Sequence, residues 1–208
     1  LLLAPWAALR AADEPAAQRP NVLVLITDDQ GFGELSRHGN PVLQTPHLDR
    51  LAAESIRFAD FHVAPMCTPT RGQLMTGVDA LRNGAMNVSS GRTLLRREFP
   101  VMPEILAAAG YRTGLFGKWH LGGPKFSPAQ QGFNHYYNGQ ANTTPTATEG
   151  GKGEYDLTDK AITWISEQPK DRPFFCYLAH NTPHIPYDAQ AHRIESNSKA
   201  FEPVYAGV

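Results

Sequence analysis

The chain has 208 residues, with 19 basic and 20 acidic side chains and a formal net charge of −1. Because there is no broad excess of basic charge, the composition argues against binding to nucleic acid or to an anionic membrane surface. No stretch approaches the roughly 20 apolar residues that span a bilayer, so no membrane span is predicted. A hydrophobic content of 41% with 18 glycines and 17 prolines is typical of a loop-rich globular domain.

The first 20 residues differ from the rest of the chain. An apolar run at 1–9 is followed by small residues and then by the polar pair Asp13-Glu14. This order is typical of a secretory signal peptide near its cleavage site, here without an initiating methionine or a charged beginning. We therefore expect residues 1–20 to be a signal-peptide remnant and linker, the folded domain to begin at residue 21, and the protein to be periplasmic or secreted.

The first predicted element is a strand at residues 21–27, a continuous aliphatic run of the kind that is buried on both faces of a parallel sheet. The pattern then predicts, in chain order, a helix from Pro46, a strand at 57–63, a helix at 103–109, a strand at 111–116, a helix at 157–168 and a strand from 173. This alternation indicates an α/β fold with a largely parallel sheet, flanked by helices on both faces and with its functional loops at one edge.

Asp28 and Asp29 directly follow the first predicted strand. In open α/β sheets ligands gather at the carboxyl ends of strands, so two adjacent carboxylates there are well placed to hold a hard cation. The alternative is that the pair only forms a turn or caps a helix.

The stretch from Cys67 to Gly77, Cys-Thr-Pro-Thr-Arg-Gly-Gln-Leu-Met-Thr-Gly, reads as the start and end of a helix. Thr68 is the expected N-cap, Pro69 the first helical residue and Gly77 the stop. Cys67 would then lie at the positive end of the helix dipole, and Arg71 would lean back toward it. A thiol, free N–H groups and a fixed cation would meet at one place, which suits an oxyanion.

Two other chemistries for Cys67 do not fit the spacing. A tyrosine-phosphatase loop needs five residues between cysteine and arginine, whereas three separate Cys67 from Arg71. A zinc site would need further thiolates or closely spaced histidines. Cys176, the other cysteine, lies in the apolar run Pro-Phe-Phe-Cys-Tyr-Leu and is interpreted as an inert core residue rather than a disulfide partner.

Histidines follow the two later strands. If strand geometry continued beyond residue 116, Lys118 and His120 would face one side and Trp119 the other. His184 is flanked by Pro183 and, two residues on, by Pro186, and these prolines would hold it on a stiff loop. His180 we interpret as a supporting residue behind the site.

Four motifs together resemble the type I sulfatases of the alkaline phosphatase superfamily, over about residues 20–190. They are Thr-Asp-Asp-Gln-Gly at 27–31, Cys-x-Pro-x-Arg with Leu-Met-Thr-Gly at 67–77, Lys-Trp-His-Leu-Gly at 118–122 and Pro-His-x-Pro at 183–186. Thr70 stands where that family more often has serine.

The resemblance implies a sulfuric ester hydrolase with a modified nucleophile. A formylglycine-generating enzyme would oxidise Cys67 to formylglycine, whose hydrated aldehyde attacks sulfur. Asp28, Asp29 and residue 67 would bind Ca²⁺, with Mg²⁺ as the alternative metal. The substrate would be a sulfate ester of a glycan or an aryl compound.

The resemblance also assigns roles to the basic residues. Arg71 and Lys118 would neutralise charge on the nucleophile and the sulfate. His120 would take a proton when the sulfated intermediate collapses, and His184 would contact the leaving oxygen.

A calcium site needs about six to eight oxygen ligands. In the family a later Asp-Asn or Asp-His pair supplies the remainder, and neither dipeptide occurs here. The resemblance therefore implies that residues 21–208 are the N-terminal part of a longer sulfatase catalytic domain, truncated at its C-terminal side. Two alternatives stay open: a phosphonate monoester or phosphodiester hydrolase of the same superfamily, and a non-catalytic fragment.

Overall fold

The computed structural model describes residues 19–89, 92–140 and 152–185. Its centre is a four-stranded sheet in the order β1-β4-β2-β3, and every neighbouring pair is parallel. The strands are β1 (Val22–Asp28), β2 (Arg112–Gly117), β3 (His135–Tyr137) and β4 (Phe174–Pro183). The parallel α/β architecture predicted from the sequence is confirmed. Of the proposed signal-peptide remnant and linker at 1–20, residues 1–18 lie outside the described residues.

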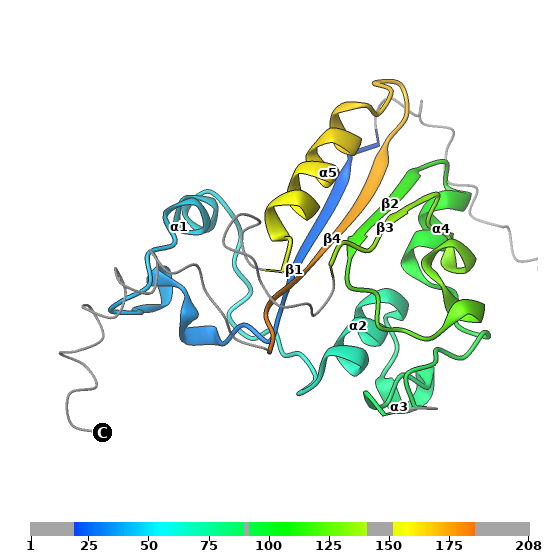
Figure 1. The fold of residues 1–208 in the computed structure, drawn as a ribbon, viewed down its shortest axis with the longest axis horizontal. Coiled ribbons are helices and arrows are strands. Elements are labelled where there is room, and N and C mark those ends of the chain that lie inside the picture. The colour runs from blue at the N-terminus through cyan, green and yellow to red at the C-terminus, as the bar shows by residue number, and fades with distance from the viewer. Residues whose placement is uncertain (1–18, 90–91, 141–151, 186–208) are drawn as a thin grey trace, which may run out of the picture.

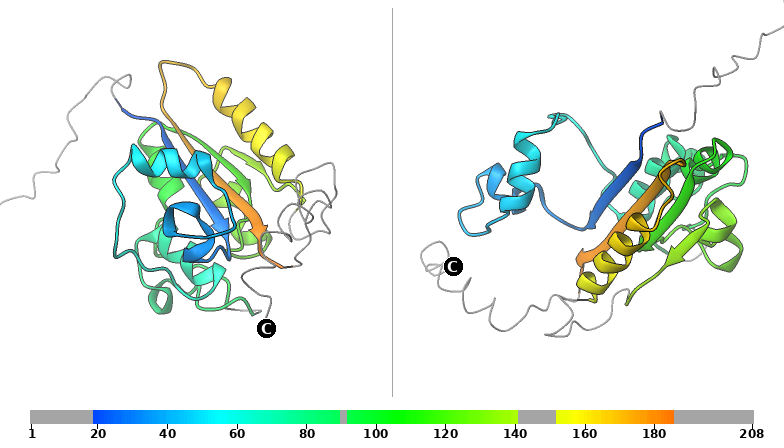
Figure 2. Two further views of the ribbon diagram at one scale, coloured as in Figure 1. Left: turned by 90° about the vertical axis from the view of Figure 1, so that its left-hand side faces the viewer. Right: turned by 90° about the horizontal axis from the view of Figure 1, so that it is seen from above.

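Helices cover both faces of the sheet. They are α1 (Pro46–Ala53), α2 (Cys67–Thr76), α3 (Ala80–Asn83), α4 (Met102–Ala108) and α5 (Glu154–Ser166). Helix α5 packs on β4 and β2 from one side, and α4 packs on β2 from the other, next to α2 (Figures 1 and 2). Helix α1 lies apart from the sheet, beyond the edge strand β1 (Figure 1).

Alternation along the strands gives each face its own core. Leu115, Phe175 and Tyr177 point toward the α4 face, where they join a larger buried cluster. Cys176, on the opposite face, is fully buried with Phe116 and the α5 side chains, so the prediction that it is a core residue is confirmed. Close packing explains one glycine here, because a Cβ at Gly114 would lie 2.9 Å from the Trp164 ring.

The start of the motif helix differs from the prediction. Helix α2 begins at Cys67 after Met66, which is extended, and the amide of Thr70 donates to the Met66 carbonyl at 3.2 Å. Thr68 is therefore not the N-cap. Its hydroxyl is fully buried and donates to the carbonyl of His120 at 3.1 Å, a contact that local sequence cannot show. The stop at Gly77 is confirmed, since this residue takes a left-handed conformation.

The predicted strand at 57–63 is wrong. This segment has no strand structure, and Phe58, Phe61 and Val63 remain more than 60% exposed. A strand requires a neighbour for its backbone hydrogen bonds, and within the described residues the sheet ends at β1. The short β3, by contrast, was not predicted because three residues carry too little pattern.

Parallel strands bring their carboxyl ends to one edge. The motif residues following β1, β2 and β4 consequently meet there, close to the N-terminus of α2 (Figure 1). Among the described helices, none combines the length and apolarity needed to cross a bilayer.

Candidate active site

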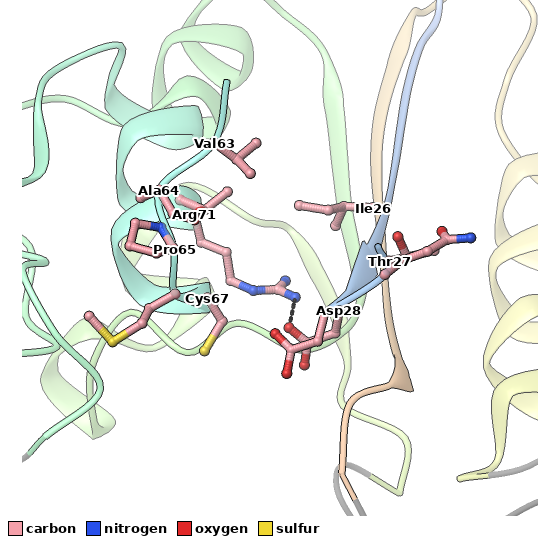
Figure 3. A pocket seen from close by; sticks show the side chains of 12 residues that line it. Ile26, Thr27, Asp28, Val63, Ala64, Pro65, Cys67 and Arg71 are labelled. Atoms are coloured by element: carbon pink, nitrogen blue, oxygen red, sulfur yellow. Dashed lines mark hydrogen bonds and ion pairs between the residues drawn. The ribbon is translucent and has the colours of Figure 1, made fainter. Parts of the chain in front are cut away.

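The carboxylate of Asp28 lies at the centre of the predicted site. It is 2% exposed at the end of β1, where its Oδ1 accepts from Arg71 Nη2 at 3.2 Å and its Oδ2 from Lys118 Nζ at 2.5 Å. Figure 3 shows Arg71 extending from α2 across the cavity to Asp28. One buried carboxylate thus holds two cations that come from different elements of the fold.

Arg71 is fixed by further contacts. Its Nη1 donates to the carbonyl of Lys118 at 2.9 Å and to the hydroxyl of Tyr177 at 3.1 Å. Burial raises the pKa of Tyr177, and the neighbouring Arg71 charge opposes this rise. Within the described residues Arg71 Nε has no partner, so the buried guanidinium keeps one unused donor.

Cys67 and His120 lie side by side. Cys67 Sγ is 3.2 Å from His120 Nδ1, and burial, followed by the charges of Lys118 and Arg71, lowers the pKa of His120. The lowered pKa favours the neutral imidazole, which can accept a proton.

The backbone between Gly117 and His120 does not continue as the strand that the sequence suggests. β2 ends at Gly117, and His120 is left-handed with φ of 56°. Lys118 and His120 nevertheless both contact site residues, while Trp119 is buried in the core as predicted.

Asp29 and His184 form the outer part of the site. His184 Nε2 lies 3.7 Å from Asp29 Oδ2, and its Nδ1 donates to the carbonyl of Ile185 at 2.7 Å. The Asp29 side chain is 47% exposed, in contrast to the buried Asp28. The structure thus brings together all seven residues proposed from the sequence: Asp28, Asp29, Cys67, Arg71, Lys118, His120 and His184.

Two cavities open beside this group. The first, of about 370 Å³, is lined by Asp28, Asp29, Cys67 and Arg71 (Figure 3). The second, of about 350 Å³, is lined by Lys118, His120 and the segment around Pro124. Because Lys118 bonds Asp28 and His120 contacts Cys67, the proposed catalytic residues form the wall between the two cavities.

The first cavity is lined by oxygen-bearing side chains of the type that bind a hard cation. The carboxylates of Asp28 and Asp29 and the amide of Gln30 line it, and oxygen ligands are those that Ca²⁺ and Mg²⁺ prefer. Within the described residues, however, no group of three or more histidine, cysteine and carboxylate side chains gathers in a way that could hold a metal. These residues can therefore supply part of a metal site.

Two charged residues near the site were not predicted. Lys152 is 2% exposed, and its Nζ donates to the carbonyls of His184 and Ile185, the latter at 2.8 Å. Glu154, at the start of α5, accepts from the amide of Asn181 at 2.8 Å and pairs with the ring of His180. This pairing gives His180 the supporting place expected for it, and both unpredicted residues hold the segment that carries His184.

The backbone conformation of Lys152 links this residue to the proposed site, although the sequence alone gives no indication of it. Among the described residues other than glycine, three have a positive φ: Asp29, His120 and Lys152. Two of these belong to the proposed site, and such conformations concentrate where function requires a fixed geometry. Burial lowers the pKa of Lys152, while the carboxylates of Asp28, Glu154 and Asp29 oppose this change.

Comparison with known proteins identifies related chains. Human (Homo sapiens) arylsulfatase A is 37% identical over 220 residues, covering 85% of this chain and 43% of the relative. N-acetylgalactosamine-6-sulfatase from Homo sapiens is 32% identical over 212 residues, covering 82% and 41%. The chain thus spans less than half the length of these two curated relatives.

A solved structure agrees with these relatives. The structure of BT4656 in complex with its substrate D-glucosamine-2-N,6-O-disulfate has a TM-score of 0.68 and 29% identity, covering 81% of this chain and 35% of that one. The family model described as Sulfatase matches residues 20–206. With this match over most of its length, the chain belongs to the sulfatase family.

Proposed function

We propose that the protein hydrolyses sulfate esters, with the side chain at position 67 as nucleophile after its conversion to formylglycine. One observation carries this proposal. Five residues from three separate segments meet at the sheet edge: Asp28 bonds Arg71 and Lys118, Cys67 contacts His120, and Cys67 lines the same cavity as Asp28 and Arg71. A chance Cys-Pro-Arg helix start would not require a buried carboxylate, two buried cations and a histidine beside the cysteine.

The converted side chain would supply a hydroxyl nucleophile on the Cβ of residue 67, so the present Sγ marks the place of an oxygen. Hydrated formylglycine carries a second hydroxyl on the same carbon. When the sulfated intermediate expels sulfate and reforms the aldehyde, this second hydroxyl would lose its proton to His120, whose Nδ1 lies 3.2 Å from the present Sγ. Arg71 and Lys118 present positive charge where the sulfuryl group would carry negative charge. His184 lies at the exposed side and would contact the leaving oxygen.

A bound Ca²⁺ would supply positive charge that orients the sulfate and the nucleophile; Mg²⁺ is the alternative. Asp28, Asp29 and residue 67 would contribute ligands, and Lys118 and Arg71 fix Asp28 for that purpose. The remaining ligands would have to come from outside the described residues.

Sulfated sugars are the favoured substrate class. The relative N-acetylgalactosamine-6-sulfatase and the structure bound to a glucosamine disulfate both act on sulfated sugars by name. Maturation would require a formylglycine-generating enzyme as a transient partner, and a periplasmic or secreted location would fit a glycan substrate.

The test uses the full-length protein, co-expressed with a formylglycine-generating enzyme. The values of kcat/KM for an aryl sulfate and a matched aryl phosphodiester should differ strongly in favour of the sulfate, and Cys67→Ala should abolish both activities. A preference for the phosphodiester would replace the proposal by a phosphodiesterase of the same superfamily. Sulfated-sugar binding without turnover by the aldehyde-bearing protein would indicate a binding protein.

A further inference from the structure

A third cavity of about 210 Å³ lies outside the active site and has a strongly basic lining. Arg96 and Arg97, from the loop before α4, and Lys125, from the turn Pro124–Phe126, contribute three cations. Gln130 and Gln131 add neutral amide groups, and Glu104 contributes the one carboxylate of the lining. We call this cavity the basic pocket.

The positive charge of the basic pocket is not compensated by the surrounding protein. None of the three cationic side chains makes a hydrogen bond or an ion pair within the part of the chain that the structure describes. The carboxylate of Glu104 accepts from the amide of Val101 at 3.1 Å, and its single negative charge leaves the three cations of the lining in excess. Three exposed cations that line one cavity, against a single carboxylate, favour an anionic ligand.

Hydrogen bonds fix the backbone segments that carry the three cations of the basic pocket. The amide of Arg96 donates to the carbonyl of Asn83 at 2.7 Å, and the amide of Phe126 donates to that of Gly123 at 2.8 Å. The guanidinium of Arg97 lies 5.4 Å from the centre of the Phe126 ring, a cation–π contact that orients it. Less conformational freedom is therefore lost when a ligand binds.

The basic pocket shares a wall with the active site. Trp119, between Lys118 and His120 in the chain, donates from Nε1 to the carbonyl of Phe126 at 2.7 Å. Pro124 lines the second cavity beside Lys118, and the next residue, Lys125, lines the basic pocket. A ligand extending from the catalytic wall past Pro124 would therefore reach the three cations.

We propose that the basic pocket binds a second anionic group, a sulfate or a carboxylate, on the same glycan chain whose sulfate ester is hydrolysed at residue 67. This proposal rests on the proposed function and narrows its substrate class to glycans with several anionic groups. The planar guanidinium matches two oxygens of such a group, and the glutamine amides can donate to its remaining oxygens. A small aryl sulfate would contact the proposed catalytic residues and would not reach the basic pocket.

The test compares two triple variants of the full-length protein. Arg96→Gln/Arg97→Gln/Lys125→Gln removes the cations of the basic pocket. The control Arg82→Gln/Lys160→Gln/Lys170→Gln removes the same charge from exposed positions outside the described cavities. For a multiply sulfated oligosaccharide we expect the pocket variant to raise KM about tenfold with kcat unchanged, and for a monosulfated aryl substrate to change neither. An equal rise of KM in the control variant, or none in the pocket variant, overturns the proposal.

Direct binding separates this proposal from the catalytic one. Fluorescence anisotropy of a labelled multiply sulfated oligosaccharide is measured on Cys67→Ala protein, with and without the pocket substitutions. Affinity lost only in the pocket variant supports the basic pocket even if the wild-type protein proves inactive on sulfate esters. If the wild-type protein hydrolyses sulfate esters but the pocket substitutions leave this binding unchanged, the basic pocket is refuted and the catalytic proposal stands. If inorganic sulfate binds as tightly as the oligosaccharide, the pocket is a site for free anions and the glycan proposal fails.

Discussion

Lys118 Nζ lies 2.5 Å from Asp28 Oδ2, and both side chains are almost completely buried. The residues are 90 positions apart in the chain, and their contact joins the carboxyl ends of β1 and β2. Since Arg71 bonds the other oxygen of Asp28, one carboxylate balances two cations at the proposed reaction centre.

Asp28→Asn should strongly destabilise the metal-free protein. The substitution leaves Arg71 and Lys118 buried beside a neutral amide, and removal of one partner of a buried ion pair costs about 3–5 kcal/mol. We expect a matching fall in the free energy of unfolding, measured by urea denaturation in the presence of a chelator. Asp29→Asn is the control, because this half-exposed side chain should change stability much less. Equal effects of the two substitutions would contradict the central place given to Asp28.

Lys118→Ala should lower kcat for an aryl sulfate by about a hundredfold, as expected when one preorganised charge contact to the transition state is lost. Arg71 still pairs with Asp28, so circular dichroism should show a folded protein. Lys160→Ala, on the exposed side of α5, is the control and should keep wild-type kcat. A Lys118→Ala enzyme with near wild-type kcat would remove this lysine from the mechanism.

Glu154→Ala should weaken the segment that carries His184. The change leaves the buried amide of Asn181 without its acceptor, at a cost of about 1–3 kcal/mol, and frees the ring of His180. We expect kcat to fall because His184 is held less firmly, and Glu154→Gln to recover part of the stability, since its amide oxygen can still accept from Asn181. Glu167→Ala, at the exposed end of α5, serves as the control. If Glu154→Ala unfolded at the same urea concentration as the control, the supporting role would be wrong.

Cys176 should be unreactive in the folded protein. Burial raises the pKa of its thiol from 9.0 to about 12, so the reactive thiolate is absent at neutral pH. Between pH 9 and 12 the unfolded chain loses this proton before the folded chain does, so the contribution to stability falls as pH rises. Mass spectrometry after iodoacetamide treatment at pH 8 should find Cys176 unmodified until urea is added, whereas the partly exposed Cys67 reacts in unconverted protein. Labelling of both thiols at equal rates in the native state would show that Cys176 is accessible.

Strands and site residues could be predicted from the sequence where the local residue pattern determines the structure. The aliphatic runs predicted as parallel strands are β1 and β4, and the chemistry follows directly at their carboxyl ends. The expected burial of β1 on both faces is wrong, because β1 is an edge strand of the described sheet and Leu23 and Leu25 are 53% exposed. The convergence of Asp28, Cys67 and Lys118 could therefore be predicted from strand ends and motifs alone.

Long-range contacts account for what could not be predicted. The aromatic run at 57–63 has strand-like residues but no neighbouring strand within the described structure. Thr68 satisfies its hydroxyl with His120, 52 residues away, rather than capping its own helix. Lys152 and Glu154 resemble ordinary polar residues at the start of a helix. They are buried because β4 packs beside α5 and brings the segment that carries His184 into contact with them.

The central claim is that position 67 acts as a formylglycine in sulfate-ester hydrolysis. Its most direct test measures, in one set of full-length preparations with different degrees of conversion, the aldehyde fraction at residue 67 by peptide mass spectrometry and the turnover of an aryl sulfate. We predict that turnover rises in proportion to the aldehyde fraction and is absent in Cys67→Ala protein. Turnover that is independent of the aldehyde fraction, or fully converted protein that leaves the sulfate ester intact while a control sulfatase converted in the same cells is active, would contradict the claim.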